Sequence, residues 1–393
     1  MKFSIEEARC RIITAQGLGT DTLPFGSGKA GAIKALEHLS YVQIDTISVV
    51  ERAHHHIFQS RVSDYELQHL HELVAVDRSA FEYWSHAASY LPMRDFRYSL
   101  PRKRKYANGE NHWFVPTAEH KKQRKIILDR LRAEGPLQSK DFERPAGSKN
   151  GWFERTPAKQ MLEQLFNEGV LMIRERKGFQ KVYDLTERVL PAHVDTSFPS
   201  SLEMGMYLVR SALRAQALAS AAEIAYLRAP ELKESVGLAL KKMLASGEIA
   251  LVEVEGLEKD YFALTSEIEK PAQEVKSARV KILSPFDSIV IQRKRLQDFF
   301  DFNYQIECYV PQPKRKYGYF TLPLLYRGEF VGLVDLKAHR PQKKLEVTAC
   351  FLRAEVKQDA EFLAELKASL KKFALFNGCE KVSFSKRPLL YKA

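Results

Sequence analysis

Apolar residues near the start of the chain recur first at helical spacing and then at the alternating spacing of an extended chain. The helical part follows the run Gly26-Ser27-Gly28 and contains Ala30, Ile33, Leu36 and Leu39. From Tyr41 to Val50 the sequence YVQIDTISVV alternates and is rich in β-branched residues, which favours an extended chain. Side chains two residues apart in an extended chain point to the same side, so Gln43 and Asp45 would project together.

A carboxylate beside a carboxamide could hold and activate a water molecule. The spacing of Gln43 and Asp45 also fits a simpler interpretation. Asp45 is followed by Thr46 and Ser48, so its side chain could merely cap or turn the chain, and Gln43 could be an ordinary surface amide. Spacing alone leaves both interpretations open, because a short motif is only a hypothesis until its structural context is known.

Two interior segments repeat one pattern of helices and strands. In each, helical spacing is followed by a glycine, a β-rich hairpin and a tyrosine, and the matching positions are 78 residues apart: Gly169 and Gly247, Gly178 and Gly256, Tyr183 and Tyr261. Three helices followed by a hairpin are the pattern of a winged helix. A winged helix most often binds DNA, but it also serves as a protein-docking module.

From Ser277 onward the pattern changes to strands, and we expect a small β-barrel-like domain closed by an amphipathic helix. The predicted strands are 289–291, 305–309, 318–325, 329–336 and 345–352, and the helix is 361–376. The sequence therefore predicts a fold of the α+β class, in which tandem winged-helix domains are followed by this C-terminal domain. The expected domains are 1–116 (a first winged helix with extra helices, carrying Gln43 and Asp45), 117–195, 196–275 and 276–393.

The charge balance favours a polyanionic partner, nucleic acid before an anionic membrane. The chain has 61 Lys and Arg against 49 Asp and Glu, a formal net charge of +12. Its four cysteines are far apart, which fits a reducing compartment and excludes a Cys-x-x-Cys site. The N-terminus lacks an apolar signal core, and no uncharged apolar run is long enough to span a bilayer. We therefore expect a cytoplasmic protein with no membrane partner.

Three histidines follow the extended stretch, and two arginines bracket them. If the chain stays extended, His54 and His56 share a side and could bind a metal, although no matching third ligand is visible. The alternatives are histidines that are buried or hydrogen-bonded in the core, or histidines that contact DNA. We expect no metal, and the candidate DNA contacts in this run are Arg52, His54, His55 and Arg61.

A second candidate DNA contact interleaves basic and aromatic residues. The run is Lys314-Arg315-Lys316-Tyr317, followed by Gly318, Tyr319 and Phe320. Such interleaving suits phosphate contacts together with stacking on bases or sugars. The alternative is a strand whose aromatic rings lie in the core and whose charges are solvated.

Several of these segments resemble one family. The run VQIDTISVVERAHHHIFQSR is similar to the winged-helix crosslink-repair DNA glycosylases of the YcaQ/AlkX type, related to AlkZ. That family has a Gln-apolar-Asp or Gln-apolar-Gln catalytic motif, and Gln43-Ile44-Asp45 fits the Asp version. Further segments that resemble the family are 81–92, 283–288, 309–325 and 331–340, so the resemblance spans most of the chain.

The resemblance implies a monofunctional DNA glycosylase that hydrolyses the N-glycosidic bond of cationic N7-alkylpurines and unhooks interstrand crosslinks in DNA repair. Gln43 and Asp45 would be its catalytic residues, with no cofactor. Its partner would be double-stranded DNA with alkylated guanine or crosslinks, bound by a monomer. The alternative is a non-enzymatic winged-helix DNA-binding regulator, which would need neither Gln43 nor Asp45 in a cleft.

Overall fold

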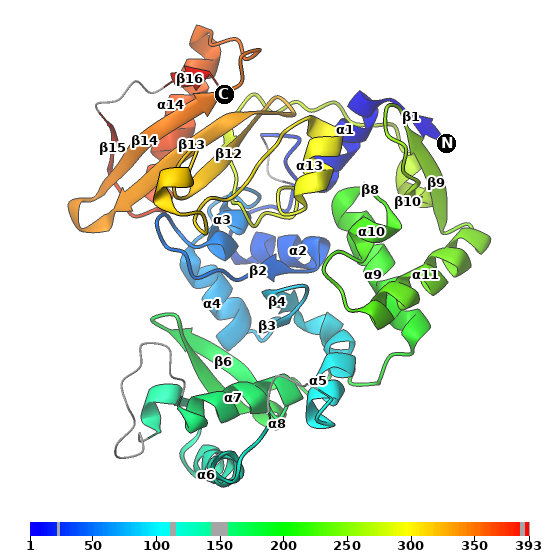
Figure 1. The fold of residues 1–393 in the computed structure, drawn as a ribbon, viewed down its shortest axis with the longest axis vertical. Coiled ribbons are helices and arrows are strands. Elements are labelled where there is room, and N and C mark those ends of the chain that lie inside the picture. Colours follow the sequence, from blue (N-terminus) through cyan, green and yellow to red (C-terminus); the bar gives the residue numbers. More distant parts are fainter. Residues whose placement is uncertain (22–23, 111–114, 143–155, 386–389, 393) are drawn as a thin grey trace. The chain divides into compact units, whose positions relative to one another are not determined.

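The computed structural model describes all residues except 22–23, 111–114, 143–155, 386–389 and 393 (Figure 1). Its helices and strands confirm a mixed α+β protein. The chain forms two compact units, of which the first contains residues 1–66, 85–88 and 201–393 and the second contains 67–84 and 89–200. The expected first domain, 1–116, thus contributes to both units. No helix among the described residues has the length and apolar character needed to cross a membrane.

The second unit contains the first copy of the repeated pattern. Its elements are α4 (Leu67–Ala75), β3 (Ala80–Trp84), most of β4 (Ala88–Pro92), the 3-10 helix η1 (Met93–Ser99), α5 (Leu100–Ala107), α6 (Ala118–Glu134), β5 (Leu137–Gln138), the 3-10 helix η2 (Ser139–Asp141), α7 (Pro157–Glu168), β6 (Leu171–Lys177), β7 (Gln180–Leu185) and α8 (Thr186–Val189). The bounds of α7 follow from its sequence. Thr156 caps the helix by accepting the Lys159 N–H, and Gly169 ends it in the left-handed conformation.

The first unit contains the second copy, with the same order of elements as α6 to α8. It consists of α9 (Ser201–Gln216), β8 (Leu218–Ala219), α10 (Ala221–Ile224), α11 (Pro230–Ala245), β9 (Ile249–Val254), β10 (Tyr261–Leu264) and α12 (Thr265–Ile268). In both copies the second hairpin strand pairs antiparallel with the short strand after the first helix. The glycine pairs 78 positions apart all have positive φ. One difference is β1 (Lys2–Phe3), which pairs in parallel with β9.

Close helix packing stabilises the second copy. A Cβ at Gly205 on α9 would lie 2.0 Å from the carbonyl oxygen of Ser235 on α11, so only glycine permits this approach.

The N-terminal elements of the same unit are α1 (Ile5–Ala15), α2 (Gly28–Leu39), β2 (Val42–Gln43) and α3 (Ala53–Gln59). Ser4 caps α1, because its hydroxyl accepts the Glu7 N–H at 3.1 Å.

The C-terminal part is a mixed sheet, with both antiparallel and parallel strand pairs, and it is covered by a helix (Figure 1). Its strands are β11 (Lys281–Ile282), β12 (Thr321–Tyr326), β13 (Glu329–His339), β14 (Lys344–Leu352), β15 (Lys381–Phe384) and β16 (Leu390–Lys392), and its helices are α13 (Arg293–Phe300), α14 (Ala360–Phe376) and the 3-10 helices η3 (Gln312–Lys314) and η4 (Arg340–Gln342). The strand order runs from β11 to β15, and these two strands do not pair within the described residues. The sheet is therefore open, and the expected barrel-like closure is not confirmed.

Two predicted strands in this region are wrong. Residues 289–291 form a turn in which the Ile289 and Ile291 N–H groups donate to the side chain and the carbonyl oxygen of Asp287. Residues 305–309 form a loop and turn. The apolar run of 289–291 misled the prediction because Ile289 and Val290 are buried in the core without belonging to a strand.

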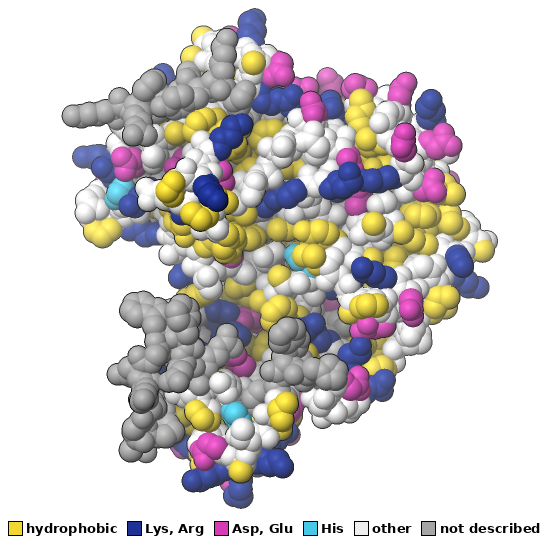
Figure 2. Space-filling model, viewed as in Figure 1, with side chains coloured by type: hydrophobic (Ala, Val, Ile, Leu, Met, Phe, Trp, Pro, Cys, Tyr) yellow, Lys and Arg dark blue, Asp and Glu magenta, His cyan; other side chains and the backbone are white. Residues whose placement is uncertain are grey.

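On the face drawn in Figure 2, the basic side chains do not form a single patch. Figure 2 shows Lys and Arg distributed over the drawn face, interspersed with acidic and apolar side chains. The net charge of +12 is therefore not gathered into one patch on that face. Candidate DNA contacts have to be judged one residue at a time.

Candidate functional site

The stretch that carries Gln43 and Asp45 is anchored at its start. Helix α2 ends at Ser40, which adopts a left-handed conformation (φ 68°) and donates its N–H to the Leu36 carbonyl at 2.8 Å. Val42 is buried, and the Ile44 N–H donates to the Ala88 carbonyl at 2.8 Å. The chain is therefore extended at Val42 and Gln43 as predicted, but the strand ends there and does not continue to Val50 as expected.

The other end of the stretch is held by the C-terminal sheet and helix. The Ala338 N–H on β13 donates to the Val49 carbonyl at 2.9 Å, and Val50 is buried in the core of that sheet. The Glu51 N–H donates to Asn377 Oδ1, just after α14, at 2.6 Å. Asp45 thus lies between two fixed points, which is the condition for a side chain to keep one orientation.

Asp45 is half-buried, and its carboxylate has a defined position. Its Oδ1 accepts the Ile47 N–H at 2.7 Å, which is the local turn that the simpler interpretation of the sequence anticipated. Burial raises the pKa of Asp45, while the N–H groups of Ile47 and Thr46 and the charge of Arg52 act in the opposite direction. Because a carboxylate has about four acceptor positions, this turn leaves capacity for a water molecule.

Gln43 is held by a histidine that the sequence does not place near it. His86 Nε2 and Gln43 Oε1 are hydrogen-bonded at 3.1 Å. Burial and the nearby Arg228 charge lower the pKa of His86 to about 4, so the imidazole is neutral at physiological pH. Its ring contacts Tyr41 edge-on at 5.0 Å and Tyr226 at 5.7 Å. A neutral imidazole donates from one nitrogen only, so Nε2–H donates to the Gln43 oxygen.

A loop from the C-terminal part lies beside Asp45. Burial, followed by the charge of Asp45, raises the pKa of the Cys308 thiol. The charge of Asp45 also contributes, after burial and Cys308, to the raised pKa of Tyr309. The Tyr309 side chain is 75% exposed. An exposed aromatic ring beside a carboxylate is a surface on which a nucleobase could stack.

The basic–aromatic run belongs to this loop and is not the predicted strand, which begins only at Thr321. The half-buried Tyr317 ring packs edge-on against Phe351 at 5.1 Å, so it supports the core and is not placed to stack on a base. Arg315 donates from Nε to the Val310 carbonyl at 2.8 Å. The exposed side chains that remain for phosphate contacts are Lys314 and Lys316.

Glu307 fixes the backbone of the same loop. Its carboxylate accepts the N–H groups of Lys316, Tyr317 and Gly318 at 2.8, 2.7 and 3.0 Å. The three N–H groups hold the pKa of Glu307 below its usual value, although burial acts in the opposite direction. The backbone that presents Lys314 and Lys316 therefore has a defined shape.

The three histidines lie on a helix, so the extended geometry that a metal site at His54 and His56 would need is not present. They form the first turn of α3, where His54 and His56 are buried. His56 Nε2 is hydrogen-bonded to the Ile282 carbonyl at 2.8 Å, and His55 Nδ1 to the Tyr65 hydroxyl at 2.8 Å. Burial lowers the pKa of His55 to about 3 and of His56 to about 4. The proposed DNA contact of buried His54 is wrong, and His55 is neutral and hydrogen-bonded within the protein.

The described residues also offer no other metal site. Within the described ranges, no group of three or more His, Cys, Asp and Glu side chains could hold a metal ion. We therefore identify no residues that would bind a metal.

Arg61 is a structural residue, and its expected phosphate contact is wrong. Its side chain is fully buried and forms two hydrogen bonds of 2.7 Å to the Asp287 carboxylate, which is also fully buried. Its other donors reach the Gln16 backbone and side chain and the Ser60 hydroxyl. Arg52, by contrast, is half-buried at the start of α3 and acts on Asp45, so it stays a candidate contact.

Sequence reasoning missed two residues of the candidate site, His86 and Tyr309. Both lie in segments that resemble the glycosylase family, 81–92 and 309–325. That resemblance was the available signal, but nothing in the spacing connects either residue with Gln43 or Asp45. His86 is 43 positions from Gln43.

The chain is similar to known proteins over most of its length. The family described as "DNA glycosylase AlkZ-like" matches residues 36–376, a range that contains Gln43, Asp45, His86 and Tyr309. Among solved structures, the DNA glycosylase AlkZ of Streptomyces sahachiroi is similar with a TM-score of 0.63 and 16% identity, and the match covers 98% of this chain and 100% of that one. At this identity the structural likeness shows a shared fold. The family match covers most of the chain, and the protein belongs to the AlkZ-like DNA glycosylase family.

Proposed function

We propose that the protein hydrolyses the N-glycosidic bond of cationic N7-alkylpurines in double-stranded DNA and unhooks interstrand crosslinks formed through such bases. The observation that carries the proposal is the position of Asp45, a half-buried carboxylate two residues from Gln43 and just beyond β2, in a segment whose backbone is held at both ends. In the family to which the chain belongs, the Gln-apolar-Asp motif matches Gln43-Ile44-Asp45.

Asp45 serves two purposes in this reaction. As the bond between C1′ and N9 breaks, its electron pair moves to the base, and the sugar acquires oxocarbenium character that a nearby carboxylate stabilises. A water molecule then forms a bond to C1′ and gives up a proton to Asp45. Partial burial strengthens both effects, since it raises the pKa of the base and reduces solvent screening of the charge.

Gln43 positions the water or the carboxylate. Because His86 donates to its side-chain oxygen, the amide nitrogen of Gln43 is the end that can donate to a water or to the substrate. The neutral ring of His86 adds no positive charge beside the developing sugar cation. His86 is thus a positioning residue that acts through Gln43.

A single carboxylate suffices because of the substrate's charge. Protonation of the leaving group normally requires a second acid. An N7-alkylated guanine already carries positive charge and leaves as a neutral molecule, so no acid is needed. The same requirement selects cationic lesions over intact bases. Water as the nucleophile makes the enzyme monofunctional, with an abasic site as its product.

DNA is held, in this proposal, by winged-helix modules and by single basic residues. The α6 to α8 and α9 to α12 segments have the element order of a winged helix, and residues around α2 and β2 would form a third such module. Lys314 and Lys316 on the loop beside Asp45, together with Arg52, would contact phosphates. An interstrand crosslink ties the lesion to the opposite strand and so resists full base flipping.

The direct test uses duplex DNA with one N7-methylguanine under single-turnover conditions. Treatment with alkali after incubation reveals abasic sites as strand breaks. We expect breaks at the lesion only after alkali, and no excision of guanine from the matched undamaged duplex. A duplex with a guanine–guanine N7 crosslink tests unhooking in the same assay. No excision from either damaged duplex would contradict the proposal.

A further inference from the structure

A basic cleft lies at the opposite end of α3 from Asp45. Arg52 at the start of α3 acts on Asp45, whereas Gln59 and Ser60 at its end line the cleft. The other walls come from the β11 region and from α14, and the cleft has about 510 Å³ of empty space, partly open to solvent. Helix α3 is seven residues long, so the two sites are separated by roughly 10 Å along its axis.

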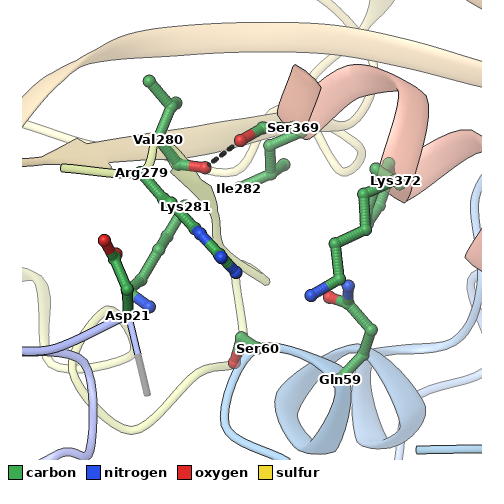
Figure 3. Close-up of a pocket in the computed structure, with 10 residues that line it drawn as sticks. Asp21, Gln59, Ser60, Arg279, Val280, Lys281, Ile282, Ser369 and Lys372 are labelled. Atoms are coloured by element: carbon green, nitrogen blue, oxygen red, sulfur yellow. Dashed lines mark hydrogen bonds between the residues drawn. The ribbon is translucent and has the colours of Figure 1, made fainter. Parts of the chain in front are cut away.

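Three cations converge on this cleft. Figure 3 shows Arg279 and Lys372 extending toward the same space from different walls, with the Gln59 amide beside the Lys372 ammonium. Neither Arg279 nor Lys372 forms an ion pair within the part of the chain that the structure describes. The third cation is Lys281, whose Nζ donates to the Thr20 carbonyl at 3.3 Å.

The acidic residue in the cleft does not neutralise these cations. Asp21 accepts the Ser277 hydroxyl at 2.7 Å and the Ala278 N–H at 3.4 Å. Burial acts to raise the pKa of Asp21, but these bonds, together with the charges of Arg279 and Lys281, hold it below its usual value. The cleft is therefore lined by one carboxylate and three cations.

The surroundings of Lys281 disfavour its positive charge. Burial lowers the pKa of Lys281 to about 8. The charges of Arg61, Lys372 and Arg279 act in the same direction, and only Asp21 opposes them. An anion in the cleft would relieve this repulsion.

We propose that this cleft binds a phosphate group. Arg279 offers a planar fork that can contact two phosphate oxygens, and Lys372 and the Gln59 amide offer further donors from the other side. A backbone phosphate of DNA and a free phosphate share this chemistry. The site uses neither Gln43 nor Asp45, so it stands apart from the proposed excision reaction.

The first experiment is a calorimetric titration of the full chain with inorganic phosphate. The test variant is Arg279→Gln with Lys372→Gln. The control variant is Lys371→Gln, which leaves Arg279 unchanged. Lys371 is an exposed neighbour on α14 that does not line the cleft. If the ligand is free phosphate, we expect the test variant to bind it at least about tenfold more weakly, which corresponds to a loss of about 1.4 kcal/mol. The control should bind phosphate as the wild type does. Thermal unfolding checks that all variants are folded.

The second experiment measures affinity for an undamaged duplex as a function of salt. If the ligand is a backbone phosphate, the test variant should lower the slope of log affinity against log salt by about 0.9 for each cation that contacted a phosphate, and by more than the Lys371→Gln control. A changed slope assigns the cleft to DNA. An unchanged slope with weakened binding of inorganic phosphate assigns it to a free phosphate.

The proposal is overturned if inorganic phosphate binds the wild type and the test variant equally, or not at all, and the salt slope is also unchanged. The Asp45→Asn variant separates this outcome from the proposed function. It should retain phosphate binding in the cleft even if excision is lost, and the cleft variant should bind phosphate weakly whether or not the protein excises a base.

Discussion

Asp45 and Gln43 are each held by one specific contact, and the two contacts have different consequences for catalysis. The Ile47 N–H orients the Asp45 carboxylate, while partial burial makes it more basic. The His86 ring orients the Gln43 amide without carrying charge. These surroundings fit the proposed roles of Asp45 as the base and Gln43 as the positioning group.

The pH dependence of excision should show the raised pKa of Asp45. The active form is the ionised carboxylate, so the single-turnover rate should fall about tenfold per pH unit below its pKa and level off above it. Because burial raises that pKa, the inflection should lie above the ordinary value of 3.8. Rates on N7-methylguanine DNA, corrected for spontaneous depurination, give the profile. A rate that rises as the pH falls would indicate a required acid instead.

Replacing His86 should slow excision through Gln43. His86→Phe keeps a ring against Tyr41 but removes the hydrogen bond, which is worth about 0.5–1.5 kcal/mol and so about three- to tenfold in rate. In the Gln43→Ala background the same change should have little further effect. Additive losses in the double variant, measured by single-turnover rates, would show that His86 acts independently of Gln43.

Sequence reasoning identified the candidate catalytic pair but not its support. Gln43 and Asp45 are two positions apart, so their spacing is visible in the sequence, although the strand ends at Gln43. The contact between Gln43 and His86 depends on tertiary structure, as does the burial of Arg61 against Asp287, 226 positions away. A basic residue beside a candidate motif looks the same in sequence whether it faces DNA or the core.

Among the structural elements, the loop before β12 carries the proposed phosphate contacts Lys314 and Lys316. Replacing Lys314 and Lys316 with Ala should lower the slope of log DNA affinity against log salt by about 1.8, since each phosphate contact contributes about 0.9. Lys343→Ala is a suitable control because its ammonium is already paired with Glu380. Affinities measured across a salt series decide the matter. An unchanged slope would mean that this loop does not touch the DNA backbone.

The contact between the end of α3 and the 283–288 loop should be essential for stability. Arg61→Met leaves the fully buried Asp287 carboxylate without its partner, which should cost about 3–5 kcal/mol. Arg327→Gln, which breaks an exposed ion pair with Glu361, should have a much smaller effect. Urea unfolding of both variants compares them. Equal stabilities would show that the buried pair is not needed.

The accuracy of the predicted elements follows from where their apolar side chains lie. The last helix was predicted as 361–376 and is Ala360–Phe376, because its apolar face packs on the sheet at helical spacing. The strand predicted as 345–352 is Lys344–Leu352 for the same reason. Residues 289–291 were predicted as a strand, yet they are buried in a turn held by Asp287. Periodicity fails where burial does not depend on a regular element.

At the scale of the whole molecule, the order of elements was easier to predict than their grouping. The repeat found from matching glycines occurs as the same succession of helices and strands in both copies. The division into units was not predictable, because residues 85–88 belong to the first unit although their neighbours on both sides belong to the second. Such an exchange depends on contacts distant in sequence.

The most direct test of the whole account is single-turnover excision of N7-methylguanine by Asp45→Asn. Asparagine is nearly isosteric, so folding and DNA affinity should match the wild type, as thermal unfolding and binding to an undamaged duplex can verify. The substitution removes both the negative charge and the base, and general-base contributions are about 100- to 10,000-fold. We predict a loss of at least about two decades in rate. Excision within a few-fold of the wild type would contradict the assignment of Asp45 as the catalytic carboxylate.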